Sequence, residues 1–436
     1  MGYTIAIVGR PNVGKSTLFN RLIGEKKAII DDVSGVTRDR IYGECEWGGR
    51  IFNVIDTGGF VAHSEDIFEK HIREQVLIAM EEADLLLFMV DASCGITDYD
   101  DDFAKIMRKH QGNVFLVVNK VDNNERAYMA SEFYSMGMDH MYQLSSMTGS
   151  GTGELLDAIV ERIPKDLEND ERDENVPRVC IIGQPNVGKS SIVNALLGED
   201  RNIVTDIAGT TRDSIHSHYK KYGKEVVLID TAGIRRKAKV HENLEFYSVI
   251  RAINALDDAD IAIIVIDAQH GVGQQDLAIY RLAVKKKRGI IVVVNKWDLV
   301  AKSTNTAKEF EEHIKSKLAP FNDVPILFTS ALEKQRIFKL LETVEEVFSN
   351  MRTKISTSVL NEVMLKEIEK YSPPAVSGKL VKIKYVTQLP THTPSFAFFA
   401  NHPKYIKEPY RNYLEKQMRK NFSFKGVPIN IFFREK

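Results

Sequence analysis

Residues 9–16 read GRPNVGKS, and residues 183–190 read GQPNVGKS, 174 positions further along the chain. Each stretch follows a short apolar run, TIAIVG in the first case and VCIIG in the second. A GxxxxGK[S/T] pattern after a strand is typical of a loop that wraps a phosphate, because its glycines let backbone N–H groups approach closely and a helix begins there. Two such matches in a chain of 436 residues indicate two copies of one domain.

Three further motifs repeat in the same order. Thr37 of GVTRD recurs as Thr211 of GTTRD, and Asp56 of DTGG recurs as Asp230 of DTAG, again 174 positions apart. A third motif, NKxD, recurs with a spacing of 176. Four motifs in one order at nearly constant spacing indicate a duplicated nucleotide-binding domain.

Both copies alternate short β-branched apolar runs with longer amphipathic stretches. The runs are TIAIVG, IFNVIDTGG, LLLFMVDA and VFLVVNKVD in the first copy, and VCIIG, VVLIDTAG, IAIIVIDA and IIVVVNKWD in the second. Continuous apolar strands are buried on both faces, which favours a mostly parallel, doubly wound α/β sheet with functional loops at the carboxyl ends of its strands. We expect these domains at residues 1–164 and 177–350.

The remaining segments differ in charge. Residues 165–176 are almost all charged or polar, which predicts a solvated linker, with an acidic docking segment as the alternative. From Arg352 onward, 16 Lys and Arg against 6 Asp and Glu give a net charge of +10, so the rest of the chain carries −11. We expect residues 351–436 to form a small α+β domain in the order helix, strand, strand, helix, strand.

The overall composition, 43% hydrophobic and 27% charged, is typical of a globular protein. Cys45, Cys94 and Cys180 are scattered, so they predict neither disulfides nor a zinc site and fit a reducing cytoplasm. The apolar runs are shorter than the roughly 20 residues of a membrane span, and Met1 leads directly into a strand-like run without a signal peptide. We expect a cytoplasmic monomer that binds neither membrane nor DNA.

The first three motifs predict how phosphates and Mg²⁺ are held. A P-loop lysine reaches the β- and γ-phosphates, and the serine after it offers a hydroxyl to Mg²⁺. An aspartate that ends a strand can hold Mg²⁺ through water, and the DxxG glycine can donate its N–H to the γ-phosphate. The predicted catalytic residues are Lys15, Thr37, Asp56, Gly59, Lys189, Thr211, Asp230 and Gly233. The predicted Mg²⁺ ligands are Ser16, Thr37, Asp56, Ser190, Thr211 and Asp230.

The NKxD motif predicts guanine as the base. The carboxylates of Asp122 and Asp298 only accept hydrogen bonds, and guanine offers N1–H and N2–H₂ as paired donors, which adenine lacks. A site built on such bonds rejects the wrong base by about 10⁴–10⁵-fold. In each copy the asparagine ties this loop to the P-loop, the lysine stem can stack on the base, and a later Ser-Ser or Ser-Ala pair can finish the pocket.

The complete predicted nucleotide-binding set follows from these motifs. It comprises Gly9, Arg10, Pro11, Asn12, Val13, Gly14, Lys15, Ser16, Thr17, Asp56, Thr57, Gly58, Gly59, Phe60, Asn119, Lys120, Asp122, Ser145 and Ser146 in the first copy, and Gly183, Gln184, Pro185, Asn186, Val187, Gly188, Lys189, Ser190, Ser191, Asp230, Thr231, Ala232, Gly233, Ile234, Asn295, Lys296, Asp298, Ser330 and Ala331 in the second.

With these motifs the chain resembles the EngA (Der) family of tandem-domain bacterial GTPases, and the resemblance covers essentially its whole length. It implies a GTP-hydrolysing switch that binds and matures the large (50S) ribosomal subunit and its rRNA. It also implies that the C-terminal domain is KH-like. Three other protein classes fit this sequence less well. A P-loop kinase would not need NKxD twice. A trafficking GTPase would need a lipid anchor or membrane-facing helix, and a tRNA-modifying GTPase would need a further folate or redox domain, and the sequence indicates none of these features.

The position after each DxxG glycine departs from the Ras-like pattern. Phe60 and Ile234 stand where Ras-like enzymes carry a glutamine that orients water. The resemblance then implies that Asn12 and Asn186 each bind a potassium ion between the phosphates. This ion would supply the charge that an arginine finger gives elsewhere, and it would stimulate an otherwise slow hydrolysis. The alternative is that these asparagines only stabilise the P-loop turn.

The C-terminal domain departs from the KH pattern, since residues 352–436 contain no GXXG loop to clamp a nucleic-acid backbone. Two basic clusters could contact RNA instead, where the alternatives are a solvated or packed helix face in the C-terminal domain and a mobile solvated loop after DTAG. The two clusters are Lys416, Arg419, Lys420 and Lys425 in the C-terminal domain, and Arg235, Arg236, Lys237 and Lys239 after DTAG.

Overall fold

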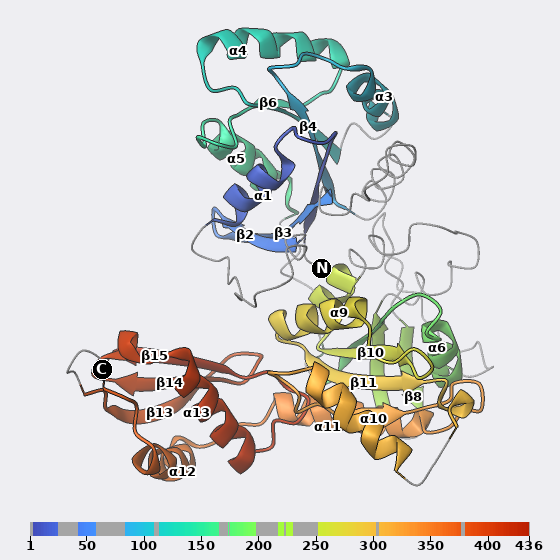
Figure 1. The fold of residues 1–436 in the computed structure, drawn as a ribbon, viewed down its shortest axis with the longest axis vertical. Helices are drawn as coiled ribbons and strands as arrows, with labels where there is room; N and C mark the ends of the chain where they lie inside the picture. Colours follow the sequence, from blue (N-terminus) through green and yellow to red (C-terminus); the bar gives the residue numbers. More distant parts are fainter. Residues whose placement is uncertain are drawn as a thin grey trace. The chain divides into compact units, whose positions relative to one another are not determined.

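A computed structural model describes residues 3–24, 42–57, 83–108, 113–164, 173, 175–197, 217–221, 224–229, 252–301, 305–375 and 380–435 (Figure 1). The chain divides into two compact units. One comprises Met1–Arg172 and His241–Asn254, and the other comprises Asp173–Val240 and Ala255–Lys436.

The first unit contains a six-stranded sheet in the order β2-β3-β1-β4-β5-β6. Only the pair of β2 with β3 is antiparallel, and the other four pairs are parallel, which confirms the predicted mostly parallel sheet. The elements are β1 (Thr4–Val8), α1 (Lys15–Ile23), β2 (Tyr42–Trp47), β3 (Arg50–Asp56), β4 (Leu85–Asp91), α3 (Asp98–Met107), β5 (Val114–Asn119), α4 (Asn124–Ala130), η4 (Ser131–Met136), β6 (Met141–Gln143) and α5 (Thr152–Arg162).

The central strands owe their positions to burial. Every residue of β1, β4 and β5 is buried, as the continuous apolar runs predicted. The amphipathic helices α1 and α5 pack their apolar faces on one side of the sheet, with Leu18, Phe19 and Leu155 in the same core as the strands. This core holds the carboxyl ends of β1, β3, β4 and β5 at one edge of the sheet.

The second unit repeats this sheet with the corresponding strand order β12-β11-β10-β7-β9-β8. Again only the outermost hairpin, β8 with β9, is antiparallel. The elements are β7 (Arg178–Ile182), α6 (Lys189–Leu197), β8 (Ser217–Lys221), β9 (Lys224–Ile229), β10 (Ile261–Asp267), α9 (Gln274–Lys285), β11 (Gly289–Asn295), η7 (Trp297–Leu299), α10 (Thr306–Lys317), β12 (Ile326–Phe328) and α11 (Ile337–Met351).

The C-terminal domain of this unit has the predicted αββαβ order. It comprises α12 (Thr357–Lys370), β13 (Ile383–Leu389), β14 (Ser395–Ala400), η8 (Pro403–Tyr405), α13 (Glu408–Asn421) and β15 (Asn430–Glu435). The central strand β14 pairs antiparallel with β13 and parallel with β15. Leu360 and Met364 of α12 and Leu414 of α13 join one buried core with strand residues such as Phe396.

The C-terminal domain forms backbone hydrogen bonds with the preceding domain of the second unit. The Ile290 N–H donates to the Gly426 carbonyl at 2.7 Å, and the Gly426 N–H donates to the Asp323 carbonyl at 2.7 Å. Gly426 has a φ of 78°, and a Cβ there would lie 2.8 Å from the Val347 Cγ2. Only glycine therefore fits this contact without a shift of its neighbours.

Arg419 belongs to the same contact rather than to an open basic surface. Its guanidinium carbon lies 4.5 Å from the centre of the Phe321 ring, and its Nη1 lies 3.5 Å from the Asp323 carboxylate. Its side chain is only 12% exposed. Of the four basic residues considered above for RNA, the other three, Lys416, Lys420 and Lys425, are exposed.

Candidate functional site

Both P-loops lie directly after the first strand of their sheet and lead into α1 or α6. Gly14 and Gly188 have φ values of 101° and 97°, in the left-handed region. A Cβ at Gly14 would lie 2.4 Å from the Asn119 Nδ2, and one at Gly188 would lie 2.2 Å from the Asn295 Nδ2. Each loop therefore needs a glycine here, because the NKxD asparagine occupies the space of a side chain.

The P-loop lysines fold back over their own loops. The Lys15 Nζ donates to the Gly9 and Arg10 carbonyls, both at 2.8 Å, and Lys15 is 7% exposed. Burial lowers the pKa of Lys15 to about 8, with a smaller effect in the same direction from Arg10 and an opposing one from Asp56. In the second domain the Lys189 Nζ donates to the Gly183 carbonyl at 2.8 Å and also to Gln184.

Ser16 and Asp56 come together as the sequence predicted for Mg²⁺. The Ser16 hydroxyl donates to the Asp56 Oδ2 at 2.6 Å, although 40 positions separate them in the chain. Thr57 donates to the Ile7 carbonyl at 2.8 Å and so fixes the end of β3 beside β1. A hydroxyl and a carboxylate are oxygen donors of the kind that Mg²⁺ prefers, so these residues fit the ion.

The NKxD asparagines bridge the P-loop to the base loop, which we define as residues 145–150 in the first domain and 330–335 in the second. The Asn119 Nδ2 donates to the Val13 carbonyl at 2.7 Å, and its Oδ1 accepts from the Ser146 N–H at 2.8 Å and the Ser146 hydroxyl at 2.9 Å. Asn295 repeats this bridge, donating to Val187 at 2.9 Å and accepting from the Ala331 N–H at 3.1 Å.

The NKxD lysines have acidic partners outside the four motifs. The Lys120 Nζ lies 2.5 Å from the Asp91 carboxylate at the end of β4, and the Lys296 Nζ lies 2.6 Å from Asp267 at the end of β10. Burial acts to raise the pKa of Asp91, but hydrogen bonds from Lys120 and Ser93 outweigh it, and the pKa lies below its usual range. The sequence contains a signal for these two aspartates, because corresponding strands of the two copies end in VDA and IDA.

The NKxD aspartates, which the sequence predicts to read guanine, differ between the domains. Asp122 is exposed and accepts a hydrogen bond from the Arg126 Nη1 at 2.8 Å. Asp298 is half-buried and follows Trp297, whose ring packs 4.4 Å from that of Phe328. Of the predicted base-loop residues, Ser145, Ser146, Ser330 and Ala331 are all buried, at the carboxyl ends of their sheets.

A second overlooked pair connects each P-loop to the helix after the fourth strand. The Arg10 Nε lies 3.3 Å from the Asp100 Oδ2, and the Gln184 Nε2 donates to the Asp276 Oδ2 at 2.8 Å. Burial raises the pKa of Asp276, against smaller effects of its hydrogen bonds from Gly273 and Gln184. The two aspartates are 176 positions apart, so the duplication could have revealed them.

Asn12 and Asn186, the candidate potassium ligands, are exposed and have left-handed φ values of 64° and 62°. The other P-loop positions follow the pattern of the domain. Val13 and Val187 are buried, Pro11 and Pro185 are half-buried, and Thr17 and Ser191 are exposed at the start of their helices, as is Ser190.

Several predicted residues lie outside the described part of the chain, where the structure does not place them. They are Thr37, Gly58, Gly59, Phe60, Thr211, Asp230, Thr231, Ala232, Gly233 and Ile234, together with the basic cluster Arg235, Arg236, Lys237 and Lys239. Within the described ranges, no helix is long and apolar enough to cross a membrane.

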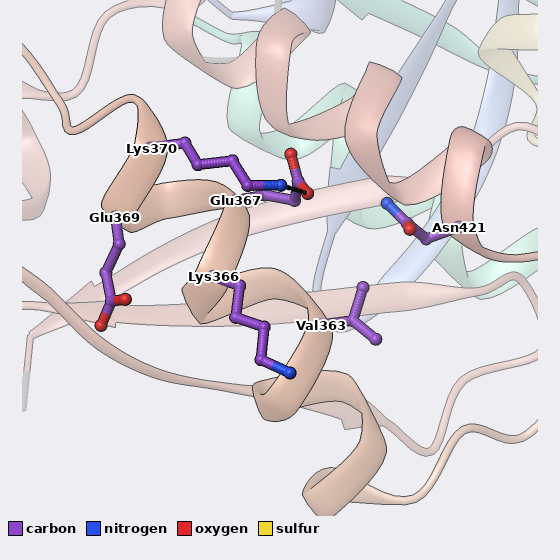
Figure 2. Close-up of a pocket in the computed structure, with 6 residues that line it drawn as sticks. All are labelled: Val363, Lys366, Glu367, Glu369, Lys370 and Asn421. Atoms are coloured by element: carbon purple, nitrogen blue, oxygen red, sulfur yellow. Dashed lines mark hydrogen bonds and ion pairs between the residues drawn. The ribbon is translucent and has the colours of Figure 1, made fainter.

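One surface pocket of the described residues lies away from these motifs, between α12 and the end of α13 (Figure 2). Its volume is about 570 Å³, and its lining includes Lys366, Glu367 and Lys370. Lys370 lies 2.6 Å from Glu367, and Lys366 lies 3.2 Å from Glu362, so both cations already have acidic partners. The pocket offers no feature that selects a ligand.

Known proteins resemble this chain along nearly its whole length. The family model described as 50S ribosome-binding GTPase matches residues 4–120 and 178–296, and a model described as the KH-domain-like C-terminal domain of EngA bacterial GTPase enzymes matches residues 354–434. GTPase Der of Flavobacterium johnsoniae is 57% identical over 432 residues, covering 99% of both chains. GTPase Der of Bacteroides fragilis is 56% identical over 439 residues, covering 100% of both. The chain therefore belongs to the EngA (Der) family of tandem-domain bacterial GTPases.

Proposed function

We propose that this GTPase is a slow, potassium-stimulated switch that binds the large ribosomal subunit and its rRNA in a nucleotide-dependent way during ribosome maturation in the cytoplasm. The family model of both GTPase domains is described as ribosome-binding, which supports this partner. The +10 charge of the C-terminal domain supports contact with RNA, because Lys and Arg neutralise phosphates. We propose no DNA or membrane partner and a monomeric state.

The strongest support for a nucleotide site is the bridge that an asparagine forms between two loops in each domain. Asn119 and Asn295 each join a phosphate-binding loop to a base loop through buried hydrogen bonds. Such a bridge holds the groups for base and phosphates at one fixed separation, which suits a nucleotide rather than a free phosphate. We therefore propose that the full predicted nucleotide-binding set, including its members outside the described residues, acts in each domain.

In this proposal the protein residues position the reactants. Lys15 would exchange its loop carbonyls for the β- and γ-phosphates, and Ser16 and Asp56 would hold Mg²⁺ directly and through water. The ion would supply charge for the developing phosphate oxygens. Thr37 would complete the Mg²⁺ shell in the first domain, and Lys189, Ser190, Asp230 and Thr211 would take the corresponding roles in the second.

We further propose that Asn12 and Asn186 coordinate a potassium ion. Their exposure leaves the side chains open to a ligand, although the left-handed φ alone would favour asparagine. Hydrolysis should be faster in potassium than in sodium at equal ionic strength, and Asn186→Ala should remove the second domain's share of this difference. Equal rates in the two salts would refute the potassium site.

The ribosome proposal is tested by sedimentation of the full chain with ribosomal particles, in a GTP analogue and in GDP. We expect co-sedimentation in one nucleotide state and release in the other. If the protein fails to sediment in either state, the ribosomal partner is wrong, whereas GTP hydrolysis would be unaffected.

The two sites can be studied separately in the full chain. Guanine needs two acceptors, and an asparagine in place of the NKxD aspartate offers one acceptor and one donor. We therefore expect Asp298→Asn to leave guanine binding to the first domain only and Asp122→Asn to leave it to the second. We call these variants the first-site chain and the second-site chain.

A further inference from the structure

Arg21 connects two parts of the first nucleotide site that lie far apart in sequence. It sits in the last turn of α1, the helix that begins with Lys15. Its Nε donates to the Ser146 carbonyl and its Nη2 to the Met147 carbonyl, both at 2.5 Å. The rigid fork of a guanidinium suits two adjacent carbonyls, and charged donors make strong hydrogen bonds.

The base loop is shaped to accept this side chain. The Gly149 N–H donates to the Ser145 carbonyl at 2.7 Å, which closes the loop into a tight turn. Gly149 has a φ of 91°, and a Cβ at this position would lie 2.7 Å from the Arg21 Nη1. A side chain at residue 149 would therefore force the guanidinium to shift away from its place against the loop.

The second domain differs at both positions. Ala195 of α6 corresponds to Arg21, since each lies six residues after the P-loop lysine. Lys334 corresponds to Gly149, since each lies four residues after the first serine of its base loop. The carbonyls of Ala331 and Leu332 accept no hydrogen bond from a side chain of any described residue. The two domains thus differ at both positions.

We propose that Arg21 is a positioning residue for guanine recognition in the first domain, and that the second domain lacks this function. By holding the carbonyls of Ser146 and Met147, Arg21 fixes the base loop on the helix that follows the P-loop. On this inference a backbone N–H of the loop then meets the guanine O6, an acceptor that it can read. This inference rests on the nucleotide site proposed above and adds a residue outside its motifs.

The test measures release of fluorescent mant-GDP from full-length variants. In the first-site chain, Arg21→Ala should speed release about tenfold, because two charge-assisted hydrogen bonds are lost. In the second-site chain, the same substitution should change nothing. Asn20→Ala, which removes the exposed neighbour on the same helix, is the matched control and should leave both rates unchanged. Arg21→Lys should resemble Arg21→Ala, because an ammonium lacks the planar fork.

An analogue separates positioning from a general loss of structure. The diphosphate of 6-thioguanosine keeps the N1–H and N2–H₂ donors but carries sulfur, a weak acceptor, in place of O6, so fixing the loop should add almost nothing to its binding. Arg21→Ala should therefore weaken GDP but leave this analogue's affinity unchanged in the first-site chain. Equal losses for both ligands would overturn the inference, as would an unchanged release rate for GDP. If the first-site chain binds no mant-GDP even with Arg21 present, the site assignment itself fails.

The reverse substitution tests whether the two positions account for the difference between the domains. In the second-site chain, Ala195→Arg with Lys334→Gly should slow mant-GDP release several-fold. Ala195→Arg alone should not, because residue 334 then keeps a side chain at the position where the first domain has Gly149. If the double variant releases nucleotide as fast as the single one, the pair does not explain the asymmetry.

Discussion

Asn295→Ala should weaken guanine nucleotide binding at the second site by about 30-fold. Asn295 is 2% exposed, and its amide joins the Val187 carbonyl of the P-loop to the Ala331 N–H of the base loop. Alanine leaves both backbone groups without this partner, and a buried unpaired group costs about 1–3 kcal/mol. Taking the lower end for each of the two groups gives about 2 kcal/mol in total, which corresponds to about 30-fold.

The measurement is an equilibrium titration of mant-GDP into the second-site chain with and without Asn295→Ala. The first-site chain with the same substitution is the control, and its affinity should not change, because Asn119 supplies the bridge there. A change below threefold in the second-site chain would show that the bridge does not hold the site together. An equal loss at both sites would indicate a general defect of folding.

Three further predictions follow from particular contacts. Asp122→Asn should change the preference of the first site from guanine to xanthine, because the oxygen at xanthine C2 accepts a hydrogen bond from the asparagine amide. Competition by XDP measures this change. The pKa of Lys15 in the nucleotide-free protein is about 8, and bound phosphates favour the charged form of this lysine. The affinity of the first-site chain for GDP should therefore be constant below pH 8 and fall up to tenfold per pH unit above it. A constant affinity between pH 8 and 9 would contradict this. Gly426→Ala should destabilise the second unit by about 1–3 kcal/mol in thermal unfolding, whereas Lys425→Ala, at an exposed neighbour, should not.

The duplication made the fold and the core of the site predictable. Motifs at the ends of buried strands had to meet at one sheet edge, because the carboxyl ends of parallel strands lie together. Ser16 with Asp56, and Asn119 with the P-loop, are the contacts that this reasoning requires. The αββαβ order of the C-terminal domain likewise followed from local hydrophobic patterns.

Contacts between motif and non-motif residues were not predictable in the same way. Arg21 lies on an exposed helix surface, where arginine is ordinary, and its partners are backbone carbonyls that leave no mark in the sequence. Arg419 looked like part of a basic RNA surface because charge counting cannot register a neighbouring ring such as Phe321. The need for glycine at position 426 could not be predicted, because it depends on a contact with the sheet that contains Ile290.

The asymmetry of the two sites also has an electrostatic component. The buried Asp100 lies beside the cation Arg10, whereas the buried Asp276 lies beside the neutral Gln184, and burial raises the pKa of Asp276. The second P-loop therefore has one positive charge fewer beside its buried aspartate, which is less favourable for a polyphosphate. This effect has the same sign as that of Arg21, so both favour tighter binding at the first site.

Gln184→Arg should restore the balance at the second site. We expect it to tighten mant-GDP binding in the second-site chain about threefold to tenfold at low salt, because one positive charge is gained near the phosphates. The gain should shrink as ionic strength rises, since salt screens charges in partly solvated sites. Gln184→Met, which has a similar size but no charge, is the control and should not tighten binding. A gain independent of salt, or one shared by methionine, would mean that packing of the P-loop, rather than charge, separates the two sites.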